Sequence, residues 1–238
     1  MKNGKLKKLI TLATVVASTF ALVACGSSSS DDSKGSDSSA KKDSGTVYRT
    51  LDEIKKDGTI NIGVFSDKNP FGYVDENGEY QGYDVYFANR IGEDLGVKVN
   101  FVSTEAANRI EYLQTGKVDL ILANFTVTDE RAEEVDFALP YMNVALGVVS
   151  PDSNVIKSLD NWNSKDQMIV ISGTTAETYL TENYPDIPLQ KYDSYATAKN
   201  ALENGNGVAW ANDIPTLHQK EINYLLLQNN MKYKPALL

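Results

Sequence analysis

The chain has 238 residues, of which 42% are hydrophobic and 23% charged, a composition that allows one large domain or two smaller lobes with a sizeable core. Its formal net charge is −9, and loss of residues 1–24 would remove four lysines and no acid, which excludes nucleic acids and anionic lipid surfaces as expected partners. The single histidine, His218, excludes a histidine-based triad or a histidine-rich metal site, and no glycine-rich phosphate loop occurs. We therefore expect no catalytic residues, no metal and no cofactor.

Residues 1–24 are predicted to be a secretory signal peptide. A basic start precedes an apolar run, Leu9–Ala24, which is shorter than the roughly 20 residues that span a membrane. The run ends in Leu22-Val23-Ala24-Cys25-Gly26, which looks like a bacterial lipobox, so we expect Cys25 to carry a lipid anchor that includes acyl chains such as palmitate. The alternative is a plain signal peptide followed by an incidental free cysteine. Cys25 is the only cysteine, so no intrachain disulfide is possible.

Residues 25–46 are predicted to be the lipidated cysteine followed by a disordered tether. Nine of the 21 residues from 26 to 46 are serine and three are glycine, with no large apolar side chain. Such a segment cannot bury a core. We therefore expect a monomer attached to the extracellular face of the cell membrane through its lipid.

The remainder of the chain alternates between strand and helix patterns. Helices are predicted at 85–95, 106–114, 129–137, 174–184 and 195–203, with Thr128 as the N-cap of the third. Strands are predicted at 59–65, 97–102, 118–123, 144–149, 168–171, 188–192 and 208–211, with a hairpin turn at 75–78.

Apolar strands that alternate with helices indicate an α/β fold with parallel sheets covered on both faces. We expect two lobes, the first over 47–146 and the second over 147–213, joined by a crossover near Val144–Val149. Residues 214–238 are an atypical tail in which Pro215 should block a helix directly after Asp213. A polar-rich helix remains possible over 219–231.

In open parallel sheets, ligands bind beyond the carboxyl ends of the strands. One such end carries Gly173, Thr174 and Thr175, and Thr174 with Glu177 predicts a capping box that opens a helix. The free N–H groups and the dipole there favour an anion such as a carboxylate. The alternative is a well-capped helix without a ligand.

A second strand end is followed by Thr126, which offers a hydroxyl, and by Arg131, whose guanidinium can hold a carboxylate through two hydrogen bonds. The alternative for Arg131 is a surface residue paired with Glu130 or Glu134. Asp213 ends a third strand and could accept an ammonium group, or it could be a strand-end carboxylate of no further role. Phe71 could supply an apolar wall or belong to the core.

Four stretches of the chain form a recognisable combination. They are Gly82-Tyr83-Asp84-Val85-Tyr86-Phe87-Ala88, Asn124 to Arg131, Val135-Asp136-Phe137 with Pro140-Tyr141, and Gly173-Thr174-Thr175 with Asp213. On these stretches, residues 51–213 resemble family 3 bacterial solute-binding proteins, the polar amino-acid receptors of ABC importers. Tyr86 stands where that family usually has a second acidic residue, and Lys68 stands near the position of its aromatic contact.

The resemblance implies a two-lobed, Venus-flytrap, periplasmic-binding-protein-like type II fold that closes on its ligand and delivers it to a membrane permease. It implies that Arg131 and the Thr175 region bind the α-carboxylate of an amino acid, and that Asp213 binds the α-ammonium with help from Asn124 and Thr126. The ligand would be of the cysteine or cystine, glutamate or aspartate, or glutamine type.

The tail does not continue the pattern of that family, which suggests a truncated or frameshifted product with incomplete closing elements. Two other interpretations stay open. One is an enzyme on the same fold, such as a dehydratase or a peptidoglycan lyase, because one fold hosts many functions. The other is a surface adhesin or a non-functional remnant.

Overall fold

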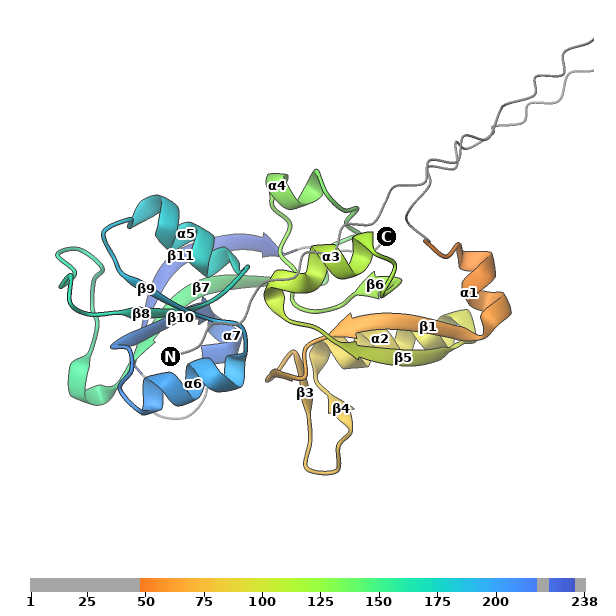
Figure 1. Ribbon diagram of the computed structural model, residues 1–238, viewed down its shortest axis with the longest axis horizontal. Coiled ribbons are helices and arrows are strands. Elements are labelled where there is room, and N and C mark those ends of the chain that lie inside the picture. The colour runs from red at the N-terminus through yellow and green to blue at the C-terminus, as the bar shows by residue number, and fades with distance from the viewer. Residues whose placement is uncertain (1–47, 218–222, 234–238) are drawn as a thin grey trace, which may run out of the picture. The chain divides into compact units, whose positions relative to one another are not determined.

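The computed structural model describes residues 48–217 with their side chains and the backbone of 223–233 (Figure 1). The predicted signal peptide, the predicted lipidation site Cys25 and the predicted tether lie outside the described residues. The three sheets belong to one compact unit of the chain. None of the described helices has the length and the apolar character that crossing a membrane would require.

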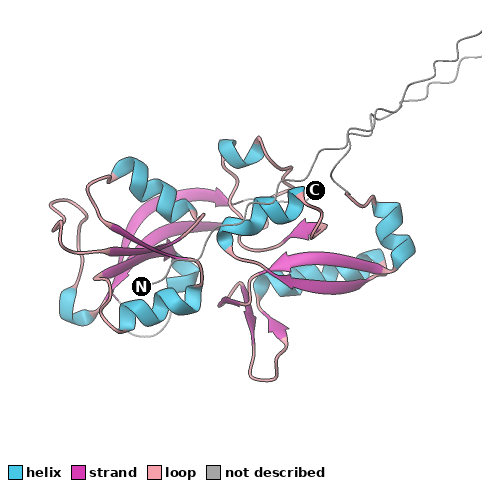
Figure 2. Ribbon diagram, viewed as in Figure 1, coloured by secondary structure: helices cyan, strands magenta, loops and turns pink. Residues whose placement is uncertain are grey.

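The first sheet has three parallel strands in the order β5 (Lys98–Ser103), β1 (Thr59–Val64) and β6 (Leu120–Ile121). Its helix α2 (Tyr83–Leu95) is amphipathic and lies along the sheet (Figure 2). Apolar residues of the sheet and of α2 form one core. Its buried members include Ile60, Ile62, Val64, Val85, Ala88, Leu120 and Leu122. The prediction of parallel pairing is confirmed for this sheet.

Two further elements flank the first sheet. Strands β2 (Asp67–Lys68), β3 (Gly72–Val74) and β4 (Tyr80–Gln81) form a small antiparallel sheet, and the predicted turn at 75–78 connects the last two. The helix α1 (Leu51–Asp57) was not predicted, although Thr50 and Glu53 form a complete capping box that the sequence pattern shows.

The second sheet has five strands in the order β11 (Asn223–Tyr233), β7 (Met142–Ser150), β10 (Ala209–Asp213), β8 (Met168–Ile171) and β9 (Leu189–Tyr192). Strands β8, β9 and β10 are parallel, as predicted. The expectation of a wholly parallel sheet is wrong here, because β7 runs antiparallel to β10 and β11 antiparallel to β7. A continuous apolar run shows that a strand is buried on both faces, but it does not give the direction of that strand.

Successive residues of β8 face two different helices, as the period of a strand requires. Met168 and Val170 share a core with α5 (Thr175–Asn183), whereas Ile169 and Ile171 share one with α6 (Tyr195–Glu203). The two helices therefore cover opposite faces of the sheet (Figure 1). The core that Ile169 and Ile171 share with α6 also includes Phe65, Leu113 and Phe125 from the first half of the chain, so the two halves pack together.

The structure corrects the prediction about Pro215 and decides a possibility that the sequence left open in the tail. The helix α7 (Ile214–Leu217) begins directly after Asp213, and Pro215 lies in its first turn, where a missing N–H leaves no intrahelical bond unmade. The polar-rich helix that the sequence left possible over 219–231 does not form from residue 223 onward, because residues 223–233 belong to β11, whose backbone pairs along the otherwise open edge of β7. The edge of a neighbouring strand is a tertiary feature that helix periodicity cannot reveal.

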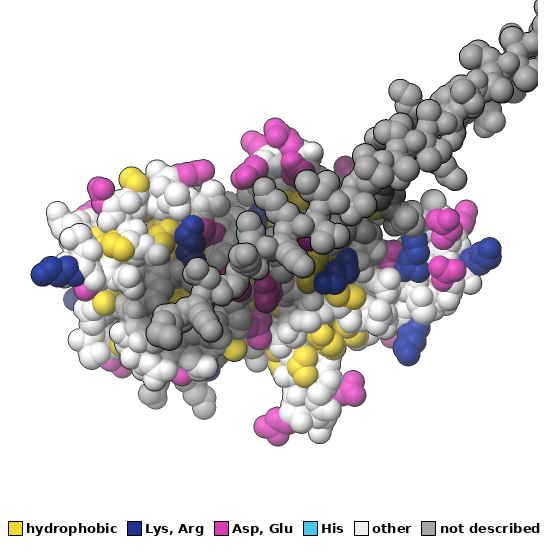
Figure 3. All heavy atoms as spheres, viewed as in Figure 1, with side chains coloured by type: hydrophobic (Ala, Val, Ile, Leu, Met, Phe, Trp, Pro, Cys, Tyr) yellow, Lys and Arg dark blue, Asp and Glu magenta, His cyan; other side chains and the backbone are white. Residues whose placement is uncertain are grey.

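The remaining elements are short. They are the helix α3 (Arg109–Gln114), the helix α4 (Asp129–Ala132) and the 3-10 turns Ala106–Asn108 and Asp152–Asn154. On the face seen in Figure 3, acidic side chains gather over α4, where Asp129, Glu130, Glu133 and Glu134 are exposed.

The division of the chain into two lobes at residue 146 stays a prediction, and β7 runs across that position.

Candidate functional site

Arg131 is positioned by the N-terminus of α4. The side chain of Thr128, the predicted N-cap, accepts a hydrogen bond from the backbone N–H of Arg131 at 3.2 Å. The guanidinium is buried and donates to the carbonyl oxygens of Thr126 and Gly173, each at 2.9 Å. The alternative that Arg131 is a solvated surface residue is therefore wrong. Arg131 instead links the loop after β6 to the loop after β8.

Asn124 and the residues after it follow β6 in a backbone conformation that few non-glycine residues adopt. The φ angle of Asn124 is 41°, and its N–H donates to the Asp84 carboxylate at 2.9 Å. The Tyr141 hydroxyl donates to the other oxygen of the same carboxylate. Asp84 thus fixes the start of the loop that carries Thr126 and Arg131. The sequence analysis placed Asp84 in a signature but gave it no role.

Burial raises the pKa of Asp84 from 3.8 to about 6, although the hydrogen bonds from Tyr141 and Asn124 act to lower it. Between about pH 4 and pH 6 the folded state therefore binds more protons than the unfolded state, so the stability that Asp84 contributes is greatest below pH 4 and is lost as the pH rises through 6.

We expect the difference in the free energy of unfolding between the wild type and Asp84→Asn to fall by roughly 3 kcal/mol from about pH 4 to about pH 7, because asparagine does not titrate. Urea unfolding at several pH values measures this difference. A difference that does not change with pH would contradict the assignment of the raised pKa to Asp84.

Asp213 ends β10, as predicted. It is buried and forms an ion pair with a lysine. The Lys68 ammonium lies 2.8 Å from an Asp213 carboxylate oxygen and also donates to the Asn124 side-chain oxygen. Three aromatic rings surround it, with the centroids of Phe65, Phe71 and Tyr195 at 5.3, 5.1 and 4.6 Å from Nζ. Phe71 therefore faces the site and is also fully buried.

The predicted strand end at Gly173, Thr174 and Thr175 is also at the site. Thr174 is the N-cap of α5 and accepts from the N–H of Glu177 at 3.3 Å. In a complete capping box the Glu177 carboxylate would accept from the N–H of Thr174. Here it accepts instead from the N–H of the preceding residue, Gly173, at 2.7 Å. Thr174 and Thr175 are buried at this end of the helix, next to the carbonyl to which Arg131 donates.

Arg109 joins these parts and was not predicted as a site residue. Its guanidinium is buried over the ring of Phe125 and donates to the carbonyls of Ala123, Asn124 and Gly173 at 3.0, 3.1 and 2.9 Å. The predicted residues Asn124, Thr126, Arg131, Thr174, Thr175, Asp213 and Phe71 thus lie in one connected region. The sequence around Arg109 is typical of an ordinary helix start, so its burial could not be predicted without knowing which residues pack around it.

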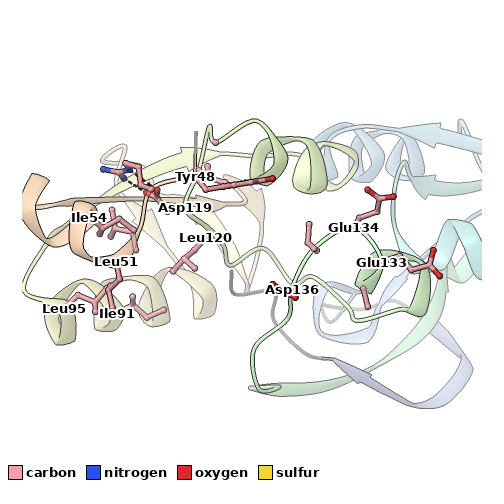
Figure 4. A pocket seen from close by; sticks show the side chains of 16 residues that line it. Tyr48, Leu51, Ile54, Ile91, Leu95, Asp119, Leu120, Glu133, Glu134 and Asp136 are labelled. Atoms are coloured by element: carbon pink, nitrogen blue, oxygen red, sulfur yellow. Dashed lines mark hydrogen bonds and ion pairs between the residues drawn. The ribbon is translucent and has the colours of Figure 1, made fainter. Parts of the chain in front are cut away.

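A cavity of about 740 Å³ lies elsewhere, beside β6 (Figure 4). Side chains of α1 and α2 line one side of it, and Glu133, Glu134 and Asp136 line the other. None of the predicted ligand contacts lines this cavity. In the part of the chain that the structure describes, no cluster of three or more His, Cys, Asp or Glu side chains could hold a metal ion.

Known structures share this fold. A cysteine-binding protein from Campylobacter jejuni is 46% identical with a TM-score of 0.72, and the match covers 79% of each chain. A solute receptor for L-cysteine of Neisseria gonorrhoeae is 45% identical with the same TM-score, over 79% of this chain and 80% of that one. These structures confirm the expected two-lobed, periplasmic-binding-protein-like type II fold.

Sequence comparisons agree. A glutamine-binding protein of a Bacillus subtilis ABC transporter is 32% identical over 90% of this chain and 77% of its own length. Residues 60–221 match the model of the bacterial extracellular solute-binding proteins, family 3, which is more than half of the chain. The buried arginine, the aspartate at the end of β10 and the capped helix between them lie within these matched residues. The chain belongs to the bacterial extracellular solute-binding proteins of family 3.

Proposed function

We propose that the protein is the receptor of an ABC importer for a polar L-amino acid, with cysteine as the first candidate. The observation that carries the proposal is a buried arginine, Arg131, at the N-terminus of α5, in a hydrogen-bonded network that reaches the Asp213 carboxylate through Arg109, Asn124 and Lys68. Both structural relatives reported above are named for cysteine, at 45% and 46% identity.

The site offers a partner for each charged group of an amino acid. Arg131 would bind the α-carboxylate with its fork of donors, and Thr174 and Thr175 would add the N–H groups and hydroxyls at the start of α5. Asp213 would take the α-ammonium beside Asn124 and Thr126. In the structure Arg131 and Arg109 donate to the Gly173 carbonyl, so a ligand carboxylate would replace part of these contacts as the two lobes close on it.

Closure would present the loaded receptor to a membrane permease. We propose that the receptor is a monomer, secreted through the signal peptide of residues 1–24, lipidated on Cys25 and tethered by residues 26–46. The tether would keep it near the permease and raise its effective concentration there. Mass spectrometry of membrane-extracted protein tests this, with a diacylglyceryl-modified N-terminal Cys25 as the expected product and a free thiol as the contrary one.

We propose binding without turnover. The polar groups of the site are two arginines, a lysine, two aspartates, an asparagine and threonines, which suit the capture of a zwitterion. Product analysis after incubation with an amino acid that binds would reveal turnover, and conversion of the ligand would favour an enzyme on this fold.

A thermal melt of the purified protein, alone and with each common L-amino acid at about 1 mM, tests the proposed function. A ligand of the native state stabilises it by about 2.7 kcal/mol at a hundred times its dissociation constant, which raises the melting temperature by several degrees. We expect a cooperative melt that cysteine and at most a few other polar amino acids raise. No shift with any amino acid would contradict the proposal.

A further inference from the structure

Five charged side chains are buried among the residues described with side chains, and all five lie at the candidate site. They are Lys68, Arg109 and Arg131, which are cationic, and Asp84 and Asp213, which are anionic. Burial works to lower the pKa of Lys68, but the Asp213 carboxylate and Tyr195 outweigh it and leave the pKa above its usual value. The side chain is therefore an ammonium at neutral pH, and the buried set carries one positive charge in excess.

A zwitterionic ligand does not remove this excess. Its carboxylate would offset Arg131 and its ammonium would offset Asp213, but Asp213 is already the ion-pair partner of Lys68 at 2.8 Å. The ligand ammonium and the Lys68 ammonium would then share one carboxylate, inside a region where Lys68 is 1% exposed. Leaving a buried charge without compensation costs several kcal/mol. A ligand whose side chain is itself an anion cancels the excess.

We propose that Lys68 makes this site select amino acids whose side chain is an anion, so that cysteine is bound as its thiolate. The inference rests on the proposed function and names the class of ligand for the same site. On binding at neutral pH, the cysteine S–H bond would break, the sulfur would keep the electron pair beside the Lys68 ammonium, and the proton would pass to solvent. The same charge excludes cationic amino acids.

The charged and polar groups around Lys68 come from several parts of the chain. Its ammonium contacts Asn124, in the loop after β6, and Asp213, at the end of β10. Tyr195 on α6 and Asp84 on α2 interact with it electrostatically, and Arg109 at the start of α3 lies against the same Phe65 ring. Asp84 titrates near pH 6 and free cysteine near pH 8.5, so experiments at about pH 7 to 8 leave Asp84 ionised and report on the ligand.

Titration calorimetry with pairs of matched amino acids tests the inference. Each pair keeps the shape and changes the charge: glutamate with glutamine, aspartate with asparagine, and cysteine with serine, which stays neutral. We expect the wild type to bind the anionic member of at least the cysteine pair about tenfold or more tightly, and Lys68→Met to lose most of that preference. Lys68→Arg keeps the charge and should retain the preference, and melts of both variants show whether each is folded.

Proton release gives a second readout that packing alone would not change. Cysteine titrations at about pH 7, in buffers with different ionisation enthalpies, should show about one proton released per cysteine bound by the wild type and far less by Lys68→Met. Equal binding of cysteine and serine without proton release, in a wild type that does bind amino acids, overturns the inference alone. Failure of the wild type to bind any member of the panel overturns the proposed function as well.

Discussion

Replacing Arg131 with alanine is expected to weaken amino-acid binding by at least about 100-fold, because removing one partner of a buried, hydrogen-bonded charge pair costs 2–5 kcal/mol or more. Arg131 is 9% exposed and donates to the carbonyls of Thr126 and Gly173, so its fork is already oriented between the two loops. Calorimetry with L-cysteine under reducing conditions measures the loss.

Arg131→Lys is the matched control for charge. Lysine keeps the positive charge but lacks the planar fork, so we expect it to recover only part of the affinity. Full affinity in Arg131→Lys would show that charge alone is needed, and unchanged affinity in Arg131→Ala would remove Arg131 from the site. Melts of the unliganded variants separate a loss of binding from a loss of folding.

Replacing Gly173 with alanine is expected to weaken binding by about tenfold or more while the protein stays folded. A Cβ at this position would lie 2.6 Å from Cα and 2.9 Å from the backbone nitrogen of Ala107, so the loop after β8 could no longer approach the 3-10 turn before α3. The Gly173 carbonyl is also the acceptor that Arg109 and Arg131 share. The variant should therefore favour an arrangement in which the two lobes stand further apart.

Gly205→Ala provides a matched control. Gly173 and Gly205 both have positive φ angles, 75° and 71°, so alanine is strained by a similar amount at each, about 1 kcal/mol. A Cβ at Gly205 would meet no atom within 4 Å. We expect Gly205→Ala to lower the melting temperature without changing affinity. Small-angle scattering should show a larger radius of gyration for Gly173→Ala alone, and equal affinities for both variants would contradict the argument.

Local signals in the sequence predicted much of the fold. The strand over 168–171 and the helix over 195–203 begin and end where expected. A continuous apolar run marks the strand, and a Ser194 cap with helical periodicity marks the helix. The direction of β7 and the strand β11 were not predictable in the same way, since both depend on which backbone edge lies next to them. Which strand pairs with which, and in which direction, does not change the hydrophobic periodicity of either segment.

The candidate site could likewise be predicted only in part. Arg131, Thr175 and Asp213 were predicted because they follow strands, and the ends of neighbouring strands come together in a sheet. Lys68 and Arg109 were missed as site residues, because a charged side chain in a loop or at a helix start is normally solvated. Their burial results from packing between the two halves of the chain, where Phe65, Phe125 and Tyr195 enclose them.

The central claim is that an amino acid binds where Arg131, Thr175 and Asp213 meet, and hydrogen–deuterium exchange with and without L-cysteine tests it most directly. The account predicts slower exchange in three segments, 124–131, 172–176 and 209–213, when cysteine is present. Protection confined to the residues that line the cavity beside β6, with no change in those three segments, would contradict it.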